Sequence, residues 1–168
     1  MLTREENERL TRVGRGTPMG ELMRRFWLPF LLDSDLGEPD GAPVRVTLLG
    51  ERLVAFRNSS GKIGLIERNC AHRCADLFFG RNEEDGLRCS YHGWKFDVTG
   101  QCVDMPTEEA ENSFKDNIRL TAYPVRERAG ILWTYMGPKE QVPALPEMEF
   151  ARVPERHRFR SEEHTSEL

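Results

Sequence analysis

The sequence predicts a mainly β fold, a small antiparallel β-sandwich or barrel that follows a short helical arm. Between about residues 28 and 138, short runs rich in β-branched and aromatic residues alternate with turn residues. Glycine-containing turn signals such as Ser60-Gly61 and Thr99-Gly100 separate neighbouring runs. Helix start signals gather in the first 27 residues. A chain of 168 residues, 38% of them hydrophobic, can bury the core of one such domain.

The predicted helical arm covers residues 1–27. Thr3 and Glu6 fit a capping box that begins a helix ending near residue 13. Thr17-Pro18 is typical of the N-cap and first position of a second helical segment, which we expect to reach residue 26. The expected apolar side of this segment consists of Leu22, Phe26 and Trp27. The arm would pack on its own domain or, alternatively, contact another subunit.

The main domain, residues 28–138, is expected to consist of short strands joined by turns. The predicted strands are residues 44–49, 52–57, 63–67, 87–89, 94–98, 101–103, 123–128 and 131–135. Residues 139–159 are rich in proline and show little periodicity, so they are predicted to be a linker toward a domain that this chain lacks. Residues 160–168 form a polar, patternless tail that looks like translated adapter sequence, so we expect the chain to be a truncated piece.

Charge and hydropathy exclude several classes of partner. The net charge is −4 and both signs are interspersed, which does not favour binding to nucleic acid. The longest apolar stretch, residues 26–32, contains Pro29 and is too short to span a bilayer. Residues 1–12 are mostly polar, so we expect that they are not a signal peptide. We therefore expect a cytoplasmic protein without a membrane partner, in which four cysteines favour metal or redox chemistry over disulfides.

Two boxes of metal-binding residues follow predicted strands. Cys70 and His72 form a C-x-H box, and Cys89 and His92 form a C-x2-H box. Loops at the ends of neighbouring strands can face each other, and each loop would then offer one thiolate and one imidazole. This ligand set matches a mixed [2Fe–2S] cluster, with the cysteines on the inner iron and the histidines on the outer one.

Two alternatives to the cluster remain open. A single zinc ion also binds two cysteines and two histidines, but zinc pairs usually have at least two residues between ligands and the first box has one. The four residues could also be ordinary buried cysteines and surface histidines. Cys74 and Cys102 are both expected to be free thiols that serve as packing residues.

The sequence resembles a known family well beyond these four residues. The segment CAHRCADLFFGRNEEDGLRCSYHGWKFDVTGQCVDMP is similar to the cluster-binding segment of Rieske non-haem iron aromatic ring-hydroxylating oxygenases, in the α subunits of the phthalate dioxygenase type. TRVGRGTPMGELMRRFWLP is similar to their N-terminal arm, and AYPVRERAGILWTYMGP to the last strands of their Rieske domain. The resemblance covers about residues 8–150. It implies an antiparallel Rieske β-sandwich with Cys70, His72, Cys89 and His92 as ligands of a [2Fe–2S] cluster.

The resemblance also implies neighbours and partners for the cluster. Arg73, Tyr91 and Trp94 would shield the loops and donate hydrogen bonds around the ligands, although Trp94 could equally be a core aromatic. A flavin and iron–sulfur reductase would supply electrons, and the full-length relative would be a homotrimer. Without the disulfide of respiratory Rieske proteins, we expect a reduction potential near the low end of the Rieske range, about −150 mV.

The mononuclear iron of this family lies in a catalytic domain, where two histidines and a carboxylate hold it. The remaining histidines here, His157 and His164, lie in a polar tail at a spacing that does not match that site. We therefore expect no catalytic residues and no oxygenase activity in this chain, which would pass electrons to an iron in a missing domain. The alternative functions are a stand-alone Rieske ferredoxin and a zinc-stabilised interaction module.

Overall fold

A computed structural model, which describes residues 1–109 and 113–158, has the mainly β architecture that the sequence predicts. The helices are α1 (Arg4–Thr11), α2 (Pro18–Met23) and α3 (Glu149–Arg152). The strands are β1 (Trp27–Leu32), β2 (Val44–Leu48), β3 (Glu51–Arg57), β4 (Ile63–Glu67), β5 (Arg81–Glu83), β6 (Gly86–Arg88), β7 (Lys95–Phe96), β8 (Cys102–Asp104), β9 (Val125–Arg128) and β10 (Ile131–Tyr135). The predicted tail at 160–168 and His164 lie outside these residues. In the described part, no helix is long and apolar enough to cross a bilayer.

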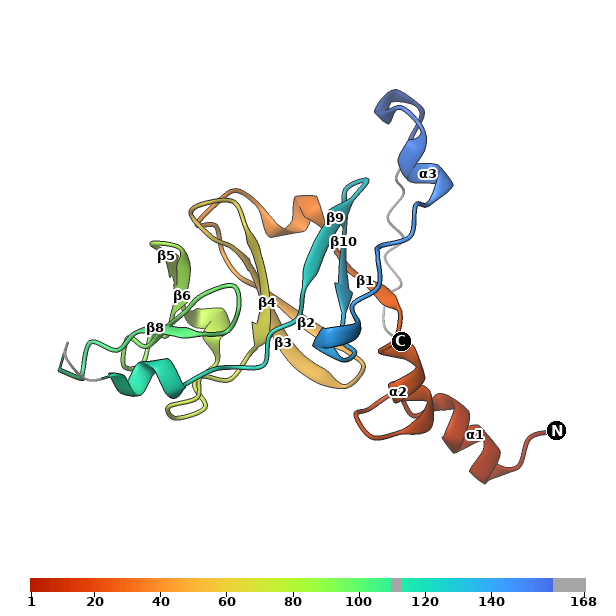
Figure 1. Cartoon of the computed structure of the whole chain (residues 1–168), viewed down its shortest axis with the longest axis horizontal. Helices are drawn as coiled ribbons and strands as arrows, with labels where there is room; N and C mark the ends of the chain where they lie inside the picture. The colour runs from red at the N-terminus through yellow and green to blue at the C-terminus, as the bar shows by residue number, and fades with distance from the viewer. Residues whose placement is uncertain (110–112, 159–168) are drawn as a thin grey trace, which may run out of the picture.

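The strands form three antiparallel sheets, and their orders are β1-β10-β9, β2-β3-β4 and β5-β6-β7-β8. Figure 1 shows the β2-β3-β4 sheet in the middle of the molecule, with β9 and β10 on one side and the β5–β8 sheet on the other. The described residues also contain short 3₁₀ helices; they are η1 (Asp33–Leu36), η2 (Leu77–Phe79), η3 (Ser113–Asn117), η4 (Lys139–Gln141) and η5 (Glu155–His157).

The central sheet is buried on both faces. Successive side chains of a strand point to opposite faces, and Leu53 through Phe56 in β3 are all essentially inaccessible to solvent. Val54 and Phe56 belong to the core shared with the β5–β8 sheet, whereas Leu53 and Ala55 belong to the core shared with β1 and β10. The continuous apolar run in β3 is therefore explained by two cores, one on each face of the sheet. The core shared with the β5–β8 sheet is the one that contains Cys70 and Cys89.

The arm differs from its prediction at its second segment. Thr3 forms the expected capping box with Glu6, and Thr17 caps α2 ahead of Pro18. However, α2 ends at Met23 rather than near residue 26. The expected apolar side is also wrong in part, because Leu22 and Phe26 are exposed and Trp27 alone is buried.

Strand β1 has no counterpart among the predicted strands. It begins at Trp27 and pairs antiparallel with β10, from Trp27 opposite Tyr135 to Leu32 opposite Ile131. It lies at the edge of its sheet, and a break in register between Pro29 and Leu31 accommodates the proline, which cannot donate to the ladder. Strand β5 is likewise an addition to the predicted set.

The first part of the predicted linker packs back onto the domain. The indole nitrogen of Trp27 donates to the Pro143 carbonyl oxygen over 2.9 Å. Leu145 and Met148 pack against the buried aromatic cluster of β1 and β10, which consists of Trp27, Trp133 and Tyr135. The segment therefore lies along the sheet that carries the arm, away from the cysteine boxes.

Candidate metal centre

The first box forms a closed loop between β4 and η2. The Leu77 amide donates to the Arg68 carbonyl over 2.8 Å, and the Cys70 amide donates to the Ala75 carbonyl over 2.9 Å. Within the loop that these two bonds close, the Cys74 amide donates to the Cys70 carbonyl over 2.9 Å. Cys74 has a φ of 54°, in the left-handed region. The chain therefore turns sharply and places His72 at the tip of the loop.

The second box repeats the same backbone geometry between β6 and β7. The Cys89 amide donates to the Trp94 carbonyl over 2.8 Å, and the Gly93 amide donates to the Cys89 carbonyl over 3.1 Å. Gly93 has a φ of 78° and occupies the position that Cys74 holds in the first loop. His92 precedes this turn. The two loops are thus structural copies that present a cysteine and a histidine each.

The four predicted ligands meet as two pairs. The side chains of Cys70 and Cys89 lie in the same core cluster and are 2% and 3% exposed. The rings of His72 and His92 lie 4.4 Å apart, centroid to centroid, and both are half-buried. The thiol pair thus lies inside the protein and the imidazole pair lies nearer the solvent, which is the order expected for an inner and an outer iron.

The donor atoms have the properties that a metal-binding group requires. Burial, followed by smaller effects that include the neighbouring Cys89 thiol, raises the pKa of Cys70 to about 12, so its thiolate needs a cation close by. Burial, followed by the charges of His72 and Arg73, lowers the pKa of His92 and favours the neutral imidazole that binds metals. The Nδ1 atom of His72 is buried and has no hydrogen-bond partner among the described residues. The residues therefore fit a [2Fe–2S] cluster.

The predicted neighbours lie against the imidazole pair. The Trp94 ring stacks on His72 at 4.7 Å and 11°, and the Tyr91 ring lies 3.8 Å from that of His92. Trp94 is buried in the core as well, whereas Tyr91 is exposed. Arg73 is exposed and close enough to His92 to affect its pKa. The roles of these three side chains as neighbours of a bound cluster stay predictions.

The two extra cysteines behave differently from each other. All four cysteines are free thiols. Cys102 is buried as expected, and burial raises the pKa of its thiol to about 11. The expectation that Cys74 is a packing residue is wrong, because this residue lies in the turn that ends the first loop and is exposed.

Arg88 is a residue of the site that sequence reasoning missed. It directly precedes Cys89 and its side chain is 12% exposed. Its guanidinium donates to the Gly93 carbonyl and to the Asp104 carboxylate, each over 2.7 Å, and to the Glu83 carboxylate over 2.6 Å. The only sequence signal is an arginine at the end of an apolar strand, which does not identify its partners.

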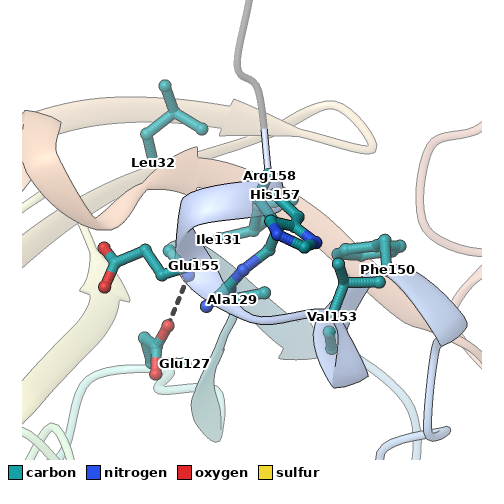
Figure 2. Close-up of a pocket in the computed structure, with 11 residues that line it drawn as sticks. Leu32, Glu127, Ala129, Ile131, Phe150, Val153, Glu155, His157 and Arg158 are labelled. Atoms are coloured by element: carbon teal, nitrogen blue, oxygen red, sulfur yellow. Dashed lines mark hydrogen bonds between the residues drawn. The ribbon is translucent and has the colours of Figure 1, made fainter.

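A large hollow in the described part of the chain lies away from the cysteine boxes. It has a volume of about 1080 Å³ between the C-terminal segment and the β9–β10 hairpin. Figure 2 shows Phe150, Val153 and His157 of that segment beside Glu127 and Ile131 of the hairpin. The dashed line marks the hydrogen bond from the hairpin turn to the Glu127 carboxylate. His157 lies here, remote from His72 and His92.

Comparison with known proteins agrees with this geometry. The family model of the Rieske [2Fe-2S] domain matches residues 26–124. The chain is 53% identical over 155 residues to the oxygenase subunit of 3-chlorobenzoate-3,4-dioxygenase from Comamonas testosteroni, covering 92% of this chain and 36% of that protein. It is 49% identical to the oxygenase subunit of phthalate 4,5-dioxygenase from Pseudomonas putida, covering 85% of this chain and 33% of that protein. The chain thus spans about a third of the length of these curated relatives.

Solved structures show the same similarity. The crystal structure of dicamba monooxygenase bound to dicamba matches with a TM-score of 0.68 and 28% sequence identity, over 78% of this chain and 41% of that one. NdmA from Pseudomonas putida CBB5 matches with a TM-score of 0.67 and 28% identity, over 80% of this chain and 41% of that one. Most of the fold of this chain is therefore shared with dicamba monooxygenase and NdmA.

Proposed function

Because the chain belongs to the Rieske [2Fe-2S] domain family, we propose that it binds a [2Fe–2S] cluster through Cys70, His72, Cys89 and His92 and carries one electron at a time. The observation that carries this proposal is the arrangement in pairs, with two buried cysteines in one core cluster and two half-buried imidazoles 4.4 Å apart. When bound, such a cluster supplies one-electron redox chemistry at a potential that two neutral ligands raise above that of an all-thiolate cluster.

The protein residues would prepare the site for that group. Burial keeps water from Cys70 and Cys89, and the stacked Trp94 ring holds the orientation of His72. The half-buried His92 lies beneath the exposed Tyr91 ring, so electrons would enter and leave at this edge of the loops. Because the imidazoles are less buried than the cysteines, the histidine side of the site would face a redox partner.

The zinc alternative is less consistent with the geometry. A single tetrahedral zinc ion needs four ligands around one point. Among residues 1–109 and 113–158, no three His, Cys, Asp or Glu side chains converge closely enough to hold one metal ion. In a [2Fe–2S] cluster each iron takes only two ligands from the protein. The thiol pair and the imidazole pair offer two each.

We further propose that the chain is the electron-transfer domain of an aromatic ring-hydroxylating oxygenase α subunit. Similarity to the oxygenase subunits covers 92% of the chain, so it includes the arm and the segment after β10, beyond the Rieske match at 26–124. This extent favours an oxygenase component over a stand-alone ferredoxin. In the longer protein a flavin and iron–sulfur reductase would supply electrons, a mononuclear iron in a catalytic domain would receive them, and the assembly would be a cytoplasmic homotrimer. The oxygenation or demethylation of an aromatic substrate would belong to that longer protein.

Metal analysis with EPR spectroscopy tests the cluster. We expect two irons and two acid-labile sulfides per chain, a low average g value after dithionite reduction, and a midpoint potential near −150 mV. Cys89→Ala should abolish this signal. Cys102→Ala is the matched control, because Cys102 is equally buried but lies outside the two boxes, and it should keep the signal. Zinc without sulfide, or a full Rieske spectrum in Cys89→Ala, would refute the assignment.

A further inference from the structure

The second loop is fixed to the rest of the domain by one buried side chain. Arg88 ends β6, and its guanidinium bonds the Gly93 carbonyl, one residue after His92. The same group bonds Asp104 at the end of β8 and Glu83 in β5. Three different segments therefore meet at one rigid planar cation, whose donors point in fixed directions.

The first loop has a weaker side-chain support, a 3.3 Å hydrogen bond from the Asn69 amide nitrogen to the Cys74 carbonyl. Arg68, two residues before Cys70, is as buried as Arg88, but its ion pair with Asp76 is longer, at 3.5 Å. Its Nε atom has no hydrogen-bond partner among the described residues. Backbone bonds close both loops in the same way. The second loop therefore differs from the first in being bonded by a guanidinium that also bonds two carboxylates.

The turn at Gly93, whose carbonyl Arg88 bonds, packs closely against its surroundings. A Cβ atom at this position would lie 2.9 Å from the Pro106 ring, so the turn already packs closely against the segment after β8. Arg88 joins the Gly93 carbonyl to Asp104 on the same side. A small displacement of the guanidinium would therefore move the turn, and with it the His92 ring that lies 4.4 Å from His72.

We propose that Arg88 is a positioning residue that holds the His92 loop at its working distance from His72 and thereby tunes the reduction potential of the site. This inference rests on the proposed function. Arg88 acts through geometry more than through charge, because the carboxylates of Glu83 and Asp104, with that of Glu84 at 3.8 Å, offset its positive charge. A lysine keeps the charge but cannot bond three partners in fixed directions.

The test compares Arg88→Lys with Arg81→Lys in the full 168-residue chain. Arg81 is the matched control, because it also pairs with Glu83 but is 68% exposed and is not bonded to the loop. We expect Arg88→Lys to shift the midpoint potential, broaden the EPR lines and lose its cluster to a chelator about tenfold faster. Arg81→Lys should match the original protein in all three measurements.

The outcomes separate this inference from the proposed function. If the original chain holds no iron or sulfide, the proposed function fails and the inference fails with it. If the original chain holds the cluster and Arg88→Lys is unchanged, or if Arg81→Lys shifts equally, only the inference is overturned. Should Arg88→Lys fail to fold, Asp104→Asn weakens one anchor of the guanidinium and should give a smaller potential shift. An unchanged potential in Asp104→Asn would then contradict the proposal.

Discussion

At the scale of single residues, the two loops show how one backbone shape tolerates different side chains. Cys74 and Gly93 occupy the same turn position, and both have positive φ. Glycine adopts this conformation without a steric penalty, whereas a residue with a Cβ atom is strained by about 1 kcal/mol. Cys74 is exposed, so its side chain gains no packing in return. The first loop therefore carries local strain that the second loop lacks.

Replacing Cys74 by glycine should stabilise the protein. Relief of the left-handed strain outweighs the extra chain entropy of glycine, and we expect a gain of about 0.5–1 kcal/mol in the free energy of unfolding. Urea unfolding under anaerobic conditions measures this change. Cys74→Ala is the control, since it removes the thiol and keeps the Cβ atom. An equal gain in Cys74→Ala would show that the thiol, and not the backbone conformation, is responsible.

At the scale of elements, a buried ion pair joins the arm to the central sheet. Arg24, just after α2, donates to the Glu51 carboxylate over 2.7 Å and also to the carbonyls of Val13, Gly20 and Leu49. Tyr123 donates its hydroxyl hydrogen to Glu51, and Arg15 donates to the Tyr123 oxygen over 2.7 Å. The arm is thus anchored to β3 by charge rather than by the apolar side that the sequence suggested.

Glu51→Gln should weaken this anchor. Arg24 would remain buried without a counter-charge, at a cost of about 1–3 kcal/mol in the free energy of unfolding. Glu8→Gln in α1 is the control, because Glu8 forms exposed ion pairs with Arg4 and Arg12 that should contribute less than about 1 kcal/mol. Urea unfolding measures both variants. Equal effects would show that burial does not distinguish Glu51.

The same carboxylate predicts a pH dependence. Burial opposes the charge of Glu51, but hydrogen bonds from Tyr123 and Arg24 and the nearby Arg15 lower its pKa below the usual 4.5. A lowered folded-state pKa means that the stabilisation is fully present above the unfolded-state pKa and is lost as the pH falls through the folded-state pKa. The original chain should therefore lose part of its advantage over Glu51→Gln below about pH 4.5.

At the scale of the whole molecule, the site joins two loops from different sheets. The first loop follows β4 of the central sheet, and the second connects β6 and β7 of the outer sheet. The thiols of Cys70 and Cys89 lie in the core between these sheets. A cluster bound by both loops would therefore tie the two sheets together, so its binding would add to the stability of the fold.

Removal of the cluster should lower the thermal stability of the chain. Each 1 kcal/mol lost corresponds to about 2–4 °C in Tm for a protein of this size, and we expect a fall of several degrees. Chelation under reducing conditions followed by circular dichroism measures it. The same treatment of Cys89→Ala is the control and should cause no further fall. An unchanged Tm in the original chain would mean that the sheets pack without help from the metal centre.

The sequence by itself determined the features that depend on neighbouring residues. The capping box at Thr3, the N-cap at Thr17, the hairpin turns and the spacing of the two boxes are all local, because backbone geometry and contacts over three or four residues decide them. The ligand roles of the boxes stay predictions from that spacing. The tertiary structure alone decided that Trp27 begins a strand beside Tyr135, that Arg24 is buried against Glu51, and that Arg88 reaches Asp104. These contacts join residues far apart in the chain, and the docking of whole sheets creates them, so no local pattern could predict them.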